Sequence, residues 1–524
     1  MRKSLRLFTI LLTAVLLFTF SACGSTESNE PEDSHTTKSS EDPKASEGKD
    51  SITIAYNAEP VSLASYEANN LTTHSVCSNL YDTLIREESD GELVPGLASE
   101  WTYSDDNTEI VFTLREGIKF HDGSEMTAED VVFSMNTAIA SSKTARMTGS
   151  FEKMEKVDDT HVKLYLKYPY GAVESCLSND NCGIFSKAAY EKDPEGFTRN
   201  PVATGPYKIV SWTAGESVVM EAFADYWREP AAIKNLIFRI VPDASSGLVA
   251  LETGQIDVLN LPNTTDFDYI ESNSKLQLST TAANSFYFVA FNCTDGLFAE
   301  NKVLREVVAN AIDPEAILLG ALDGQGELVN CAIPVNVKFF PQEFDGYSYN
   351  PDYAKQLLKE SGFEGQKIKI PCMDVGNDLA ITEVVVEQLK AVGFDAEIDM
   401  MESTAFLADV YTNGLYDICV NSYTCFINDA DGIMYMRYHS DYLGGGNNFV
   451  MYNNPEMDSL LDKARSSDND DERALAYRDA CTLMRDDYVL VPILCYLNAL
   501  AADADLNGIK ASDRQRIYVY DFSW

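Results

Sequence analysis

The chain has 524 residues, of which 45% are hydrophobic, and a formal net charge of −42 at pH 7. Its length predicts several domains, and its apolar content is sufficient for large cores. A surface this acidic repels phosphate groups, so we expect neither nucleic acid nor anionic lipid headgroups as ligands.

The first 22 residues have the pattern of a secretory signal. A basic start, MRKSLR, precedes a largely apolar run over 7–20, which suits a signal's hydrophobic region and is short for a bilayer span. Two small residues then precede Cys23, an arrangement that resembles the lipobox of bacterial lipoproteins. We therefore predict a lipoprotein signal peptide over 1–22 and lipidation of Cys23, which would anchor the chain at the extracytoplasmic face of the cell membrane. The alternative is ordinary secretion with Cys23 unmodified.

Residues 23–50 almost lack large apolar side chains and contain many Ser, Thr, Asp and Glu residues. Such a segment cannot bury enough apolar surface to offset the entropy of ordering. It predicts a disordered acidic tether over 23–50, followed by a folded body that begins near residue 51. No later run is apolar enough for a membrane span, so we expect none in the body.

The body alternates predicted strands and helices. Apolar residues at every second position predict strands, and apolar residues three and four apart predict helices. The segments 366–373, 379–394 and 395–401 have the order strand, helix, strand, which indicates a parallel pair of strands. The body is therefore predicted to be mixed α/β. Further strands are predicted within 51–60, 110–120, 161–168, 205–212, 216–223, 234–241 and 255–259, and helices within 126–139, 245–253, 301–312 and 350–363.

The stretch KFHDGSEMTAED places His121 beside Asp122-Gly123, a dipeptide typical of tight turns. We interpret His121 as a structural turn residue rather than a catalytic or metal-binding one. Thr127, with Asp130 three residues later, predicts the N-cap of the helix that follows.

Motifs for catalysis and cofactor binding are missing from the sequence. It contains no GxSxG, no GxxxxGK[ST], no HExxH and no GxGxxG that opens a helix. Residues 503–514 copy the start of a calcium loop, but Arg514 stands where the loop needs a bidentate Glu, so a hairpin turn is the better interpretation. We expect no enzymatic activity, no cofactor and no resident metal.

The ten cysteines after Cys23 form no CxxC pair, which disfavours a structural zinc site. The closest pairs in sequence are Cys176 with Cys182 and Cys419 with Cys425. An exported chain permits disulfides, and the alternative for each pair is two buried thiols.

Several stretches of the body resemble, in the right order, the family 5 extracellular solute-binding proteins, which are the peptide- and nickel-binding receptors of ABC importers. The resemblance covers nearly all of 51–524. It is carried by LVPGLASEWTYSDDNTEIVFTLREGIKFHDGSEMTAEDVVFSM, NPVATGPYKIVSW, ETGQIDVL, YFVAFNC, NKVLREVVANAIDPEAI, NPDYAKQLLKESGF and NNPEMDSLLDKA.

The resemblance implies an α/β fold of the type II periplasmic-binding-protein kind, with two lobes, a hinge and three domains. The ligand would lie between the lobes, which close around it. The implied domains are domain I over 51–82, 200–290 and 496–524, domain II as an insertion over 83–199, and domain III over 291–495.

The resemblance also points to ligand-binding residues. Family members usually have a Trp, and three residues later an Asp that pairs with the α-ammonium group of a peptide. Tyr423 and Phe426 hold these positions here, so Asp429 or Asp431 could substitute for the missing carboxylate; the alternative is a turn with solvated carboxylates. Arg437 could bind a ligand carboxylate or be a surface cation.

Two more candidates, Tyr66 and Asn69, come from the segment after EPVSLASYE, which could also line the cleft. Under the nickel-binding alternative His439 would reach a metal held in a small chelator, and otherwise it is a packed or surface residue. The main hypothesis is a lipid-anchored receptor for short peptides. Its partners would be an ABC permease and the permease's ATPase subunits, and it would act as a monomer. A distant alternative is an exported hydrolase.

Overall fold

The computed structural model describes residues 49–68, 70–88 and 91–524. The predictions for the signal peptide, Cys23, most of the tether and Asn69 therefore lie outside the described residues. Residues 49–524 form a single compact unit. Among the residues that the structure describes, none of the helices has the length and hydropathy needed to span a bilayer.

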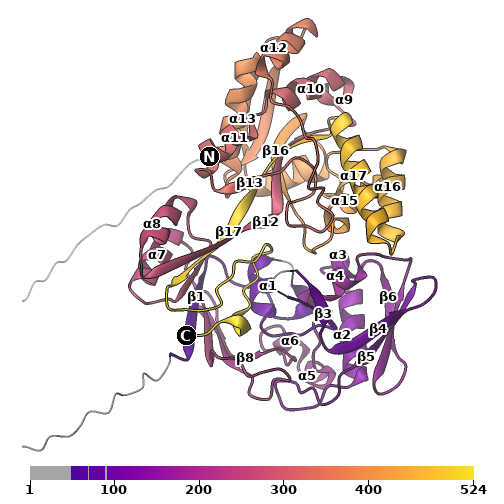
Figure 1. Ribbon diagram of the computed structural model, residues 1–524, viewed down its shortest axis with the longest axis vertical. Helices are drawn as coiled ribbons and strands as arrows, with labels where there is room; N and C mark the ends of the chain where they lie inside the picture. The colour runs from indigo at the N-terminus through magenta and orange to yellow at the C-terminus, as the bar shows by residue number, and fades with distance from the viewer. Residues whose placement is uncertain (1–48, 69, 89–90) are drawn as a thin grey trace, which may run out of the picture. The chain divides into compact units, whose positions relative to one another are not determined.

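A mixed sheet of nine strands runs through this unit. Its two longest strands, β12 and β17, are antiparallel neighbours, and Figure 1 shows them passing from the region of α7 and α8 to that of β13 and β16. Near one end β17 pairs with β11, and near the other it pairs with β13 while β12 pairs with β16. In sheet order the strands are β16 (Ile418–Thr424), β12 (Leu276–Phe291), β17 (Leu490–Asp503), β11 (Val258–Asn260), β1 (Ser51–Tyr56), β10 (Asn235–Ile240), β9 (Ser217–Ala222) and β8 (Tyr207–Thr213), with β13 (Gly326–Leu328) on β17.

We call the part built on β11, β1, β10, β9 and β8 the first lobe. It includes a four-stranded antiparallel sheet in the order β4-β5-β7-β6, on which α2 packs (Figure 1). Its other elements are β2 (Ile85–Glu87), β3 (Leu93–Pro95), β4 (Ala98–Tyr103), β5 (Glu109–Leu114), β6 (Phe151–Lys156), β7 (His161–Leu166), α1 (Leu71–Cys77), α2 (Ala128–Ala140), α3 (Ala145–Thr148), α4 (Val173–Leu177), α5 (Lys187–Lys192), α6 (Pro194–Phe197), α7 (Ala244–Glu252) and α8 (Phe267–Ser272).

The second lobe contains β13, β16 and a separate parallel pair, β14 and β15. α13 connects β14 to β15, which confirms the predicted strand-helix-strand unit. Its elements are α9 (Leu297–Glu300), α10 (Lys302–Ala311), α11 (Pro314–Leu322), α12 (Pro351–Glu360), β14 (Lys367–Met373), α13 (Asp378–Val392), β15 (Asp395–Met401), α14 (Ser403–Phe406), α15 (Asp431–Tyr438), α16 (Pro455–Ser466) and α17 (Asp470–Asp486).

The predictions for His121 and Thr127 are confirmed. The turn closes with a hydrogen bond from the Gly123 N–H to the carbonyl of Phe120. The His121 ring bonds main-chain groups of Ala203 and Gly205, and burial lowers its pKa to about 4, so the imidazole is a neutral structural element. Thr127 caps α2 in a reciprocal capping box with Asp130.

Two details differ from the sequence predictions, and the structure resolves one alternative that the sequence left open. The strand expected within 110–120 ends at Leu114, because the chain then turns toward the His121 loop. The chain turns near Gly508 after β17, but no second strand of a hairpin follows it among the described residues. The ten cysteines of the described residues carry free thiols, so neither candidate disulfide is formed in the structure.

One apolar cluster joins the lobes, since it contains side chains from both 84–184 and 282–495. The domain boundaries remain predictions. The expected end of the second segment of domain I, at residue 290, falls within one residue of the end of β12 at Phe291.

Candidate functional site

The candidate site is a cavity of about 580 Å³, which we call the central cavity. Its walls come from side chains that lie between residues 68 and 181 in the first lobe and between residues 426 and 447 in the second. This volume lies within the roughly 300–1,000 Å³ typical of small-ligand sites. A hollow of about 810 Å³ exists as well, but residues 309–349 and 491–492 line it, so the first lobe takes no part in it.

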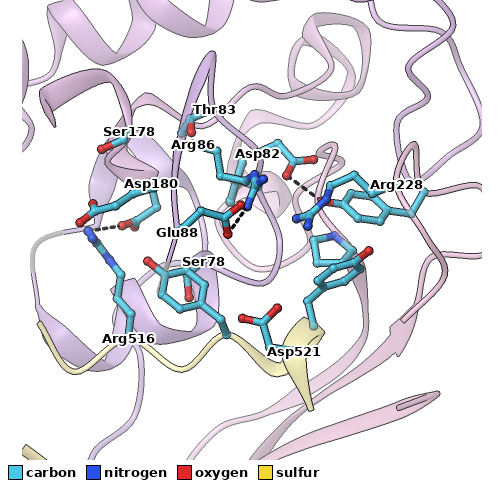
Figure 2. Close-up of a pocket in the computed structure, with 16 residues that line it drawn as sticks. Ser78, Asp82, Thr83, Arg86, Glu88, Ser178, Asp180, Arg228, Arg516 and Asp521 are labelled. Carbon is cyan, nitrogen blue, oxygen red and sulfur yellow. Dashed lines mark hydrogen bonds and ion pairs between the residues drawn. The ribbon is translucent and has the colours of Figure 1, made fainter. Parts of the chain in front are cut away.

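A smaller pocket of about 80 Å³ lies in the first lobe and is too small for a ligand of several residues (Figure 2). Figure 2 shows Arg516 bound to Asp180 in this pocket, at 2.7 Å. The second carboxylate oxygen of Asp180 is 2.7 Å from Nδ1 of His74, a residue that lines the central cavity. Burial alone would raise the pKa of Asp180, but His74 and Arg516 outweigh it and hold the pKa below its usual value. Asp180 is therefore a neutralised carboxylate between the pocket and the cavity.

The second-lobe wall begins where β16 ends, at Thr424. The loop that follows folds tightly onto the start of α15, and a Cβ atom on Gly432 would lie 2.5 Å from the side chain of Ile427. Glycine is therefore needed for this close approach. The loop places Phe426 at the cavity, where the Arg146 guanidinium from α3 lies 4.7 Å from the centre of its ring.

The carboxylates of Asp429 and Asp431 are each bound by an arginine. Asp429 receives two hydrogen bonds from Arg473, at 2.7 and 2.9 Å, and Asp431 receives two from Arg465, at 2.8 and 2.9 Å. The hydroxyl of Tyr170, from the first lobe, also donates to Asp431 at 2.9 Å. Each carboxylate side chain is only 2% exposed. A ligand ammonium group would have to displace an arginine, and the predicted ligand-binding role of both residues remains a prediction.

Tyr423 is buried behind the cavity wall and packs against Phe288, with ring centres 4.7 Å apart. The Arg437 guanidinium lies 4.2 Å from the centre of the Tyr423 ring and donates to the carbonyls of Gly446 and Asn447 at 3.0 and 3.1 Å. Asn447 lines the cavity. The Arg437 guanidinium therefore contacts a lining residue but is not itself part of the described lining. Whether Tyr423 or Arg437 contacts a ligand remains a prediction.

Tyr66 belongs to an aromatic group in the first lobe, with Phe185 and Tyr190 within 6.0 Å between ring centres. The main chain continues from Tyr66 to Ala68, which lines the cavity. The side chain of Tyr66 is therefore set back from the cavity, and its role in binding remains a prediction.

His439 stacks on Tyr435 with ring centres 4.3 Å apart, and its Nδ1 accepts the main-chain N–H of Asp441 at 3.1 Å. The ring is 6% exposed and is not part of the described lining of the central cavity. No group of three or more His, Cys, Asp or Glu residues that could hold a metal ion occurs within 49–68, 70–88 and 91–524. The geometry gives the nickel-binding alternative no support.

Among the cavity residues that the sequence did not indicate are two cations, Lys143 and Arg146. Both follow α2, in a stretch from Val131 to Phe151 that contains no Asp or Glu. In a chain with 82 acidic residues, this gap was the available signal.

Comparison with known proteins places this geometry in a family. The model of the bacterial extracellular solute-binding proteins, family 5, matches residues 92–445, which is more than half of the chain. The chain belongs to this family. Family 5 proteins are extracytoplasmic substrate-binding proteins of ABC importers, a class of binding proteins rather than of enzymes.

Individual relatives of this family 5 chain match it over most of its length. The oligopeptide-binding protein AppA of Bacillus subtilis is 25% identical over 100% of this chain and 99% of its own. The dipeptide-binding protein of Escherichia coli K12 is 26% identical over 79% of this chain and 83% of its own. The crystal structure of the ABC transporter substrate-binding protein CtaP from Listeria monocytogenes is similar with a TM-score of 0.82 and 26% identity, over 91% of this chain and 99% of that one. The chain therefore has the type II periplasmic-binding-protein fold that was expected.

Proposed function

We propose that this protein captures short peptides in the central cavity and delivers them to the permease of an ABC importer. The observation that carries the proposal is a cavity of about 580 Å³ with walls from both lobes of a family 5 scaffold. Relatives named as oligopeptide- and dipeptide-binding proteins support a peptide as the ligand.

Side-chain amides in the cavity suit a peptide backbone, because an amide oxygen can accept from a peptide N–H and an amide nitrogen can donate to a peptide carbonyl. Asn179 and Asn181 from the first lobe and Asn447 from the second line it. The Asn181 amide nitrogen also donates to the carbonyls of Ser65 and Ala68 at 2.8 and 2.9 Å, which fixes the side chain in place. Backbone recognition of this kind permits several peptide sequences to bind in one site.

The peptide proposal is tested by thermal unfolding of the purified protein with a library of short peptides of mixed sequence. Binding to the folded state alone raises the melting temperature, by an amount that grows with ligand concentration. We expect peptides to raise it, and we expect no cleavage of the peptides by the protein. A melting temperature that stays constant with peptides but rises with nickel–histidine or another ligand class would refute the proposal.

We further propose that the chain is a lipoprotein anchored through Cys23 at the outer face of the membrane. The support is the signal-like sequence that ends in two small residues and a Cys. Cys23→Ser is expected to move the protein from the membrane fraction to the soluble or uncleaved pool, because the acylated thiol is lost. Detergent phase partition of the two forms measures this, and equal partition would contradict the anchor.

A further inference from the structure

The described lining of the central cavity carries positive charge only. Lys143 and Arg146 line it, and no Asp or Glu is among the described lining residues. In the whole chain acidic residues outnumber basic ones by 82 to 40. A cavity without a carboxylate is therefore a local reversal of the overall charge.

Three buried carboxylates within five residues of a lining residue in the chain are each bound by an arginine outside the described lining. Asp180 lies between Arg516 and His74, Asp429 is bound by Arg473, and Asp431 is bound by Arg465. The Arg516 pair is visible in Figure 2. These carboxylate side chains are 2–4% exposed, so little of their charge reaches a ligand.

Two guanidinium groups lie at or near the second-lobe wall of the cavity: Arg146 lines the cavity, and Arg437 donates to the carbonyl of the lining residue Asn447. Arg146 lies over the ring of Phe426, and Arg437 is held by two carbonyls and the ring of Tyr423. Desolvation lowers the pKa of Arg146, and the nearby Arg437 lowers it further. The like charge of Arg437 near Arg146 favours an anion in the space that Arg146 faces.

We propose that the cavity selects anionic ligands: peptides whose carboxylate is not balanced by a free α-ammonium group, such as N-blocked or acidic peptides. This selection rests on the proposed function. It is the opposite of the selection expected from a site whose carboxylate binds the α-ammonium group of a peptide. Arg146 is the residue that contacts the ligand carboxylate, through the planar donor pair of its guanidinium. Lys143 adds charge at the same wall.

The test uses one library of tetrapeptides prepared in four forms: free, N-acetylated, C-amidated and blocked at both ends. Glutarate serves as a non-peptide dianion, and affinity is measured by calorimetry. We expect the acetylated acids to bind about tenfold more tightly than the free peptides, and this preference to weaken as salt is added. Arg146→Gln should remove about tenfold of the affinity for acetylated acids and leave doubly blocked peptides within about twofold.

Arg199→Gln is the matched control, because Arg199 also lies over an aromatic ring, that of Trp212, but outside the described cavity lining. It should change no affinity. Free or amidated peptides that bind as well as acetylated acids would overturn the anionic selection and leave the peptide function standing. Glutarate binding without any peptide binding would keep the anionic selection and overturn the peptide function. Failure of both acetylated peptides and glutarate to bind would overturn the anionic selection.

Discussion

Replacing Arg473 by methionine is expected to lower the free energy of unfolding by about 3–5 kcal/mol, because the change leaves a buried carboxylate without its partner. Arg473 lies on α17 and is 1% exposed. Its guanidinium binds both oxygens of Asp429 and also donates to the carbonyls of Ala464 and Gly171. Methionine fills similar space but satisfies none of these acceptors. Urea unfolding followed by circular dichroism and tryptophan fluorescence measures the loss.

Arg478→Met is the control for this variant, because it is the same substitution on the same helix. Arg478 is exposed and donates only to the carbonyl of Glu343, at 3.4 Å. Arg478→Met should change the free energy of unfolding by no more than about 0.5 kcal/mol. Equal losses in the two variants would contradict the assigned role of the Asp429 pair.

The loss of unfolding free energy caused by Arg473→Met should also depend on pH. Burial already raises the pKa of Asp429, and removal of the arginine raises it further. A group whose folded pKa lies above its unfolded value supports folding at low pH, and this support is lost as the pH rises through the folded pKa. The difference between variant and wild type should therefore be smaller at pH 4.5 than at pH 7. A deficit that is constant over this range would contradict the explanation.

Phe288→Ala is expected to cost about 3–5 kcal/mol, because it leaves a cavity in a fully buried aromatic cluster. Phe288 lies on β12 with no exposed surface. Its ring centre is 4.7 Å from that of Tyr423 and 5.1 Å from that of Phe286. The same denaturation experiment measures this loss.

Two comparisons separate the cavity effect from a general loss of aromatic side chains. Phe288→Leu keeps most of the volume and should cost clearly less than the alanine change. Tyr349→Ala, at a residue that is 50% exposed, should stay within about 0.5 kcal/mol. A cost for Phe288→Ala no greater than that for Tyr349→Ala would show that the cluster does not stabilise the fold.

Local patterns in the sequence predicted the elements well, because each pattern depends on neighbouring residues. The capping box at Thr127 and the parallel pair β14 and β15 follow from spacings of a few residues. The order of the main sheet does not, since β1 lies between β10 and β11, which come some 180 and 200 residues later in the chain. The α/β class followed from periodicity, whereas the two-lobe type II fold came from resemblance.

The candidate site was only partly predictable for the same reason. Phe426 was placed in the binding region from its position in the family pattern, and it lines the cavity. The arginine partners of Asp429 and Asp431 lie on α17 and α16, the second and the first helix after α15, where no spacing rule connects them. Arg146 reaches the cavity from the other lobe, so only the three-dimensional fold brings it to Phe426.

Native mass spectrometry of the protein purified without denaturation, with identification of every released molecule, tests the central claim most directly. A cavity with walls from both lobes should retain its ligand during purification once the lobes have closed on it, because release then requires the lobes to separate. We predict a heterogeneous set of added masses that resolve into short peptides. A single non-peptide adduct, with or without nickel, would contradict the proposed function.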